Sequence, residues 1–223
     1  MTHTLHRQGT AENLAHDYCV LAIAARGINS TGSGPKLQAI KEIFRRHNPV
    51  NLGDIKRGNM YNPGLDAVLT ATQDGTVVHA VFTTQEDLVA VLRELKDADT
   101  GMSIVVSGLF DHVGACCQKA GLTRHTVEYS LGVHGAVERL PERSLLEVTT
   151  MCGHGMVSFN LVRRMVREIE AGRRTAEDAA QELARQCICG VFNPARAAEL
   201  LTRLVDEGFG NARLNSCGSG LPT

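Results

Sequence analysis

Short runs of β-forming apolar residues alternate with amphipathic segments along most of this chain, and amphipathic segments alone follow them. The run from Tyr18 to Ala25 is short and ends beside a glycine, so it predicts a buried strand. From residue 157 onward apolar side chains recur at helical spacing, and Thr175 and Asn193-Pro194 mark two further helix starts. This order predicts an α/β fold, with a layered mixed sheet of about six strands, flanking helices and a C-terminal three-helix appendage.

Turn signals and β-rich composition place the other expected strands. Residues 49–64 are rich in Gly, Pro and Asn, which indicates an ordered surface loop or a lid over a cleft. Gln73-Asp74-Gly75 predicts the turn of a hairpin. The expected strands after the first are Asp66 to Ala71, Thr76 to Phe82, Ser103 to Val106, Thr126 to Val133 and Leu145 to Thr150.

The length of the chain, 223 residues, is typical of one domain with a sizeable core. We therefore expect a single domain over residues 1–223. Within it, residues 1–151 form the sheet portion, residues 152–209 the helical portion that bears cysteines, and residues 210–223 a loose, Gly/Ser/Asn-rich tail.

Charge and apolar content limit the classes of partner. The 23 basic and 24 acidic residues nearly balance, so neither a nucleic acid nor an anionic membrane surface is favoured as partner. No apolar run approaches the ~20 residues of a membrane span, and no leader sequence opens the chain. We expect a cytoplasmic protein that acts on a small-molecule substrate, and a homo-oligomer is compatible with this composition.

The seven cysteines are an odd number spread along a long chain, which fits a reducing compartment better than a disulfide framework. Cys19, Cys116 and Cys117 lie within regular apolar segments, which favours a core role. Cys152 and Cys189 instead stand directly before glycines, which favours a chemical role for them over a core role.

The motif Met151-Cys152-Gly153-His154-Gly155 is predicted to form a turn between a strand and an amphipathic helix. Such turns lie at the open end of an α/β sheet, where ligands usually bind. A helix N-terminus and a neighbouring imidazole would both favour the Cys152 thiolate. Cys152 and His154 are therefore the candidate catalytic residues.

A second motif, Cys187-Ile-Cys189-Gly190, follows at the end of a predicted helix hairpin whose length suffices to return the chain to Cys152. Cys152, Cys187 and Cys189 are the candidate metal ligands. Three thiolates suit a [4Fe-4S] cluster with one iron open to substrate, and Cys with His also suits zinc. Either Cys217 or His154 could supply a fourth ligand, and the backbone N–H groups of the candidate cofactor-binding residues Gly153, Gly155 and Gly190 could donate to the cofactor.

Two further segments carry groups that could hold an anionic substrate. The sequence Gly32-Ser33-Gly34-Pro35-Lys36 lies between a predicted strand and a predicted helix, so its N–H groups and Lys36 could bind a carboxylate or phosphate. It lacks the ending of a Walker loop, and an ordinary glycine-rich connection explains it equally well. The helix start at Asn193 and Arg196 supplies the second candidate anchor.

The residues Met151 to Gly155 resemble the active-site motif of the proline racemase and hydroxyproline epimerase family. In that family a cysteine at a helix start exchanges the α-proton of the substrate, so the resemblance implies an acid/base role for Cys152 with His154 in its motif. The resemblance covers five residues, and the second catalytic cysteine and second domain of that family have no counterpart in this sequence.

Three functional hypotheses follow. The leading one is an iron–sulfur lyase, hydratase or desulfurase that acts on a small anionic substrate at the open iron. The second is cofactor-free acid/base or nucleophilic catalysis by Cys152, as in a racemase or epimerase. The third is a structural or assembly protein in which zinc or a cluster holds the helical portion to the sheet.

Overall fold

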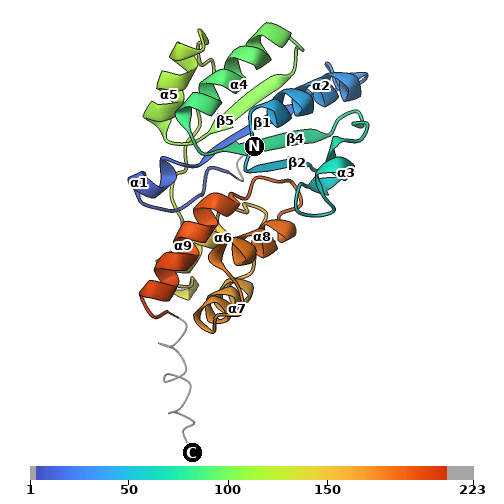
Figure 1. Cartoon of the computed structure of the whole chain (residues 1–223). Helices are drawn as coiled ribbons and strands as arrows, with labels where there is room; N and C mark the ends of the chain where they lie inside the picture. The colour runs from blue at the N-terminus through green and yellow to red at the C-terminus, as the bar shows by residue number, and fades with distance from the viewer. Residues whose placement is uncertain (1–3, 210–223) are drawn as a thin grey trace, which may run out of the picture.

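The computed structural model describes residues 4–209 and combines an antiparallel sheet with surrounding helices (Figure 1). Within that range the sheet has five strands in the order β3-β2-β4-β1-β5. Each neighbouring pair of strands runs antiparallel. The strands are β1 (Tyr18–Ile23), β2 (Asn51–Asp54), β3 (Gly58–Asn59), β4 (Val77–Phe82) and β5 (Ser103–Ser107).

Helices α2, α4 and α5 lie on one side of the sheet, and α6 to α9 lie on the other side (Figure 1). Among residues 4–209 the other two α-helices are the short α1 and α3, and Val137–Arg139 form a 3-10 helix. The α-helices are α1 (Ala11–Leu14), α2 (Ser33–Arg46), α3 (Leu65–Leu69), α4 (Gln85–Ala98), α5 (Phe110–Lys119), α6 (Arg143–Thr149), α7 (Phe159–Glu170), α8 (Ala176–Gln186) and α9 (Pro194–Asp206).

Successive side chains of a strand point to opposite faces, and this alternation divides the buried residues into two cores. On β1, Tyr18 and Val20 pack into the core beneath α2, α4 and α5. Cys19 lies between them and packs into the other core, with Val81 of β4 and the helices α6 to α9. Cys152, Cys187 and Cys189 all belong to this second core, so the central strands form its floor.

The structure has a helix in each of the three predicted C-terminal segments, and the start signals predicted for the last two are confirmed. The Thr175 side chain accepts a hydrogen bond from the Asp178 N–H at the start of α8. Asn193 does the same for Arg196 at the start of α9, and Pro194 occupies the first turn. These caps satisfy N–H groups that a helix leaves unpaired, which explains why local sequence located the boundaries well.

The prediction of about six strands is wrong in its details. Residues 65–69 form α3 and residues 143–149 form α6, because their apolar side chains also fit helical spacing: Leu145, Val148 and Thr149 are buried together on α6. Residues 126–133 have β-forming composition but are exposed and form no strand. Conversely, β2 and β3 lie inside the predicted surface loop 49–64, and all their residues are buried.

Among residues 4–209, no helix has the length and apolar character needed to cross a membrane.

Candidate functional site

The three candidate metal ligands lie in two turns of the helical portion. Cys152 occupies the turn between α6 and α7, Cys187 is the C-cap of α8, and Cys189 lies in the turn that leads to α9. All three are buried, with exposed fractions of 2%, 0% and 1%. The six cysteines among the described residues are all free thiols.

The structure brings the two turns together. The sulfur atoms of Cys187 and Cys189 are 3.9 Å apart, and the Cys189 sulfur is 3.6 Å from Nδ1 of His154. Cys152 is hydrogen-bonded to Cys187. The predicted convergence of two distant motifs thus appears as one line of contacts from Cys152 through Cys187 and Cys189 to His154, whose side chain is exposed.

Hydrogen bonding and burial keep the Cys152 and Cys187 thiols neutral when no ion is bound. The hydrogen bond with Cys187, and then burial, raise the pKa of Cys152 far above its usual range. The hydrogen bond with Cys152 lowers the pKa of Cys187, but the hydrogen bond with Cys189 and burial together raise it to about 12. A metal ion would therefore have to displace protons from these sulfurs.

Cys152 was expected to lie at a helix start that favours its thiolate, but the structure does not place it there. The segment before Cys152 is helix α6 rather than a strand, and α7 begins at Phe159 with Ser158 as its N-cap. Cys152 therefore lies seven positions before the first residue of the helix whose positive end was expected to favour its thiolate. The effect of a helix end fades within about one turn, so it does not reach this sulfur.

The sheet edge holds the Cys187 loop through two buried asparagines. The Asn59 side chain on β3 donates hydrogen bonds to the carbonyl oxygens of Ala184, at 3.0 Å, and Cys187, at 2.7 Å. The Asn51 side chain on β2 donates to the Phe192 carbonyl at 2.8 Å. The loop is thereby fixed to the edge formed by β2 and β3 at both of its ends.

Two glycines allow the same loop to lie directly on the sheet. A Cβ atom added to Gly53 would lie 2.3 Å from the Cys189 carbonyl oxygen, and one added to Gly190 would lie 2.7 Å from Gly53 Cα. Gly190 also has a φ of 77°, in the left-handed region that glycine adopts most readily. Both positions therefore require glycine for the backbones to approach.

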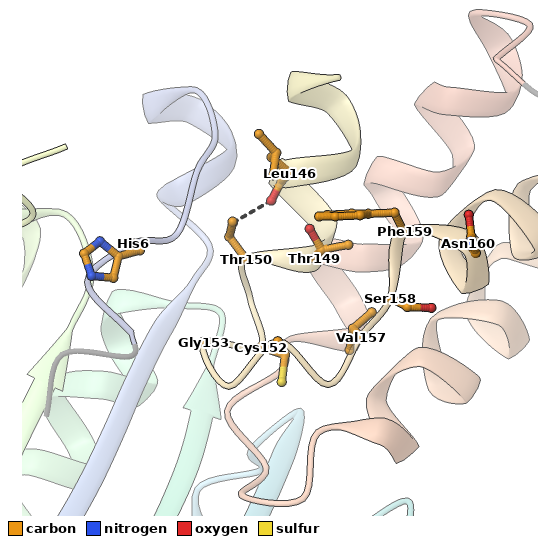
Figure 2. Close-up of a pocket in the computed structure, with 11 residues that line it drawn as sticks. His6, Leu146, Thr149, Thr150, Cys152, Gly153, Val157, Ser158, Phe159 and Asn160 are labelled. Atoms are coloured by element: carbon orange, nitrogen blue, oxygen red, sulfur yellow. Dashed lines mark hydrogen bonds between the residues drawn. The ribbon is translucent and has the colours of Figure 1, made fainter. Parts of the chain in front are cut away.

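A cavity of ≈ 430 Å³ adjoins the cysteine turns. Figure 2 shows that the Cys152 sulfur points away from Thr149, Thr150 and Phe159, which line other parts of this cavity. As far as the described residues define it, the lining includes His6 but no lysine or arginine. The full lining is His6, Leu146, Thr149, Thr150, Cys152, Gly153, Gly155, Val157, Ser158, Phe159 and Asn160.

The donor set suits a soft metal ion, although its shell is not closed. In the described part of the chain, no group of three or more His, Cys, Asp or Glu side chains is arranged to hold an ion. The pairwise contacts of Cys152, Cys187, Cys189 and His154 nonetheless connect thiol and imidazole groups, which are the preferred ligands of zinc and iron. The chemistry of these four donors, rather than a preformed coordination geometry, is what fits a metal ion.

Comparisons with protein-family models, with curated proteins and with solved structures found no match. The function proposed below is therefore inferred from the geometry of the site.

The structure does not bring the predicted glycine-loop anchor to the cysteines. The N–H groups of Gly32 and Gly34 both donate to the Asp74 carboxylate, each at 2.7 Å, so an internal anion already occupies this loop. Ser33 donates to the Ser30 carbonyl. Lys36 lies on α2, whose buried face packs in the core on the other side of the sheet from the cysteines.

The second predicted anchor lies near the cysteines but is engaged in structural contacts. Arg196 is 1% exposed and pairs with Asp17 at 2.9 Å. The side chain of Asn193 donates to the His16 carbonyl and to Asp17. Neither residue lines the cavity. Of the fourth-ligand candidates, His154 contacts Cys189, and Cys217 lies outside the described residues.

Sequence reasoning missed three residues that build this site: Asn51, Asn59 and Arg7. Asn51 and Asn59 fall in the segment interpreted as a polar surface loop, and their amides gave no signal of burial. Arg7 lies in the polar start of the chain. No local pattern could have found it, because its partners are the Asp17 carboxylate and the carbonyls of Met151 and Val191, which come close to Arg7 only after folding.

Proposed function

We propose that this chain is a metalloprotein whose centre is held by the thiolates of Cys152, Cys187 and Cys189, with His154 at the fourth position. The observation that carries the proposal is the pair of distances, 3.9 Å between the sulfurs of Cys187 and Cys189 and 3.6 Å from Cys189 to the His154 nitrogen. Ligands ~2.3 Å (sulfur) and ~2.1 Å (nitrogen) from a tetrahedral zinc ion lie roughly 3.8 Å (S to S) and 3.6 Å (S to N) apart.

These distances favour a single tetrahedral ion, and zinc is the occupant that fits best. The cysteine ligands of a [4Fe-4S] cluster bind different irons, so their sulfurs lie farther apart than two ligands of one ion. The cluster remains the second candidate for one specific reason. Three donors are buried and the fourth, His154, is exposed, which is the asymmetry expected of a centre with one exchangeable position.

The adjoining cavity supports an enzymatic role for the centre. Cys152, Gly153 and Gly155 contribute to its wall, so a ligand bound there would lie against the turn that bears Cys152, whose sulfur points to the other side of that turn. We propose a lyase or hydratase reaction, in which the ion polarises an oxygen of the substrate or activates a water molecule. Among the described residues no lysine or arginine lines the cavity, so its lining offers no permanent positive charge to hold an anionic substrate group.

The test is metal and sulfide analysis of protein purified without oxygen. We expect about one zinc per chain and no sulfide in the wild type, and loss of the metal in Cys152→Ser, Cys187→Ser and Cys189→Ser. Cys116→Ser is the matched control, because Cys116 is equally buried but belongs to the other core. Iron with equimolar sulfide would assign the cluster instead, and metal-free wild-type protein would refute both forms of the proposal.

His154→Ala separates a closed structural centre from an open one. If His154 is an exchangeable ligand, the variant retains the ion and a water molecule takes the vacant position. Loss of the metal from His154→Ala would indicate a closed Cys3His centre with a structural role, which is the third hypothesis from the sequence.

A further inference from the structure

Arg7, in the N-terminal segment, connects the two turns that bear the candidate ligands. One of its terminal nitrogens donates to the carbonyl of Val191 and, at 3.3 Å, to the carbonyl of Met151. Met151 directly precedes Cys152, and Val191 lies two residues after Cys189. A single guanidinium therefore holds together main-chain segments that are about forty residues apart, at the place where their sulfurs meet.

Arg7 also belongs to a buried group of charges that does not balance. Asp17 pairs with both Arg7 and Arg196, and the side chains of Asp17 and Arg196 are fully buried. The other acceptors of the Arg196 side chain are neutral oxygens. Glu147, the other carboxylate whose charge acts on Arg196, is itself paired with Arg203. One carboxylate thus faces two guanidinium groups, which leaves one net positive charge.

A buried excess charge is costly unless an opposite charge lies close to it. Burial lowers the pKa of Arg7, but Asp17, Cys19 and Cys187 outweigh burial and raise it overall. Through its bonds to the Met151 and Val191 carbonyls, the Arg7 guanidinium also lies beside the two turns that bear the cysteines. A divalent ion with three thiolates and a neutral imidazole carries one net negative charge, which would balance the charge of this group.

We propose that Arg7 is a positioning residue of the metal centre, which holds the two cysteine turns in register and supplies the positive charge that balances the metal–thiolate unit. This inference rests on the proposed function, since it requires a metal at these cysteines. It assigns to the N-terminal segment a role in metal affinity that goes beyond anchoring the chain end.

The experiment compares zinc affinity in four full-length proteins: the wild type, Arg7→Met, Arg7→Lys and Arg174→Met. Arg174→Met is the control, because it removes another ion pair of the same helical portion, with Glu168, which has no contact with Arg7, Asp17 or Arg196. The zinc dissociation constant is measured anaerobically by competition with a chromophoric chelator. The sulfur-to-metal absorbance of the cobalt-substituted proteins reports how many thiolates bind, which general destabilisation of a folded protein does not change.

We expect Arg7→Met to bind zinc about 10–100-fold more weakly than Arg174→Met, the effect typical of residues that support metal ligands, and to lose part of the cobalt absorbance. Arg7→Lys keeps the charge but cannot reach Asp17 and both carbonyls at once, so it should show an intermediate loss. If Arg7→Met does not fold, Arg7→Lys decides the matter by the same comparison.

Equal zinc affinity in the Arg7 variants and Arg174→Met, with unchanged cobalt spectra, would overturn this inference and leave the proposed function standing. A wild-type protein that binds neither zinc nor cobalt would overturn both. The two failures are therefore distinguishable.

Discussion

Replacement of Gly53 by alanine should test directly whether the Cys189 turn is seated on β2. The added Cβ would lie 2.3 Å from the Cys189 carbonyl oxygen, 2.6 Å from its carbonyl carbon and 2.8 Å from Gly190 Cα. All three are main-chain atoms, so no side-chain rotation relieves the overlap. The oxygen must withdraw by roughly 0.7 Å to reach 3.0 Å, and we expect a loss near the upper end of the usual cost of overpacking, about 3 kcal/mol.

The assay is urea unfolding followed by circular dichroism, with the metal content of each protein measured beside it. A loss of about 3 kcal/mol corresponds to a fall of roughly 6–12 °C in Tm for a chain of this size. Gly101→Ala is the control: its neighbourhood is open, and it should lose only the ~1–2 kcal/mol of a left-handed backbone. Gly53→Ala protein with wild-type stability and metal content would refute the proposed packing of this turn.

Three further outcomes are expected. Asn59→Ala removes the buried donor to the Cys187 carbonyl and should lower the free energy of unfolding by about 2–4 kcal/mol, measured in urea; a loss below 1 kcal/mol would contradict the anchoring role. The N–H groups of Gly34 and Gly32 hold the pKa of Asp74 below its usual value. The Asp74 carboxylate therefore stabilises the folded protein at pH values above its usual pKa, and this contribution is lost as the pH falls through the lowered pKa of the folded state. Asp74→Asn should therefore differ most from the wild type in urea midpoint near neutral pH and progressively less below about pH 4, and a constant difference would argue against the shift. Finally, removal of bound metal by a chelator should lower stability by about 2.7 kcal/mol relative to protein at a free metal concentration 100-fold above Kd, and an unchanged Tm would exclude a metal that stabilises the fold.

Local signals predicted the helical half of this protein well and the sheet less well. Thr175 and Asn193 mark helix starts through hydrogen bonds to N–H groups three residues away, so the relevant partner is in the same short stretch of sequence. Residues 145–150 are apolar enough for either a strand or a helix, and packing of α6 against α7 and α9 decided between them. The strand β2 has the sequence Asn-Leu-Gly-Asp, which lacks β-branched residues entirely, and its pairing with β4 makes it a strand.

The candidate site shows the same division. The length of the predicted helix hairpin between the two motifs predicted that Cys152 and the Cys187–Cys189 motif would lie close together, and the structure brings these residues into contact. The glycine loop at residues 32–36 looked equally suited to an anion, but Asp74 from another turn fills it. A loop N–H group is available to a ligand only if no side chain from elsewhere in the chain accepts its hydrogen bond. Sequence spacing does not indicate which N–H groups are already bonded in this way.

The sequence by itself determined the three C-terminal helices, the reactive residue types and the two motifs in which they occur, because caps, periodicity and side-chain chemistry are properties of short segments. Only the tertiary structure decided that Asn51, Asn59 and Arg7 hold those motifs together and that the buried charges of Arg7, Asp17 and Arg196 do not cancel. Charge balance and close backbone approach depend on distances between residues far apart in the chain, and folding alone sets those distances.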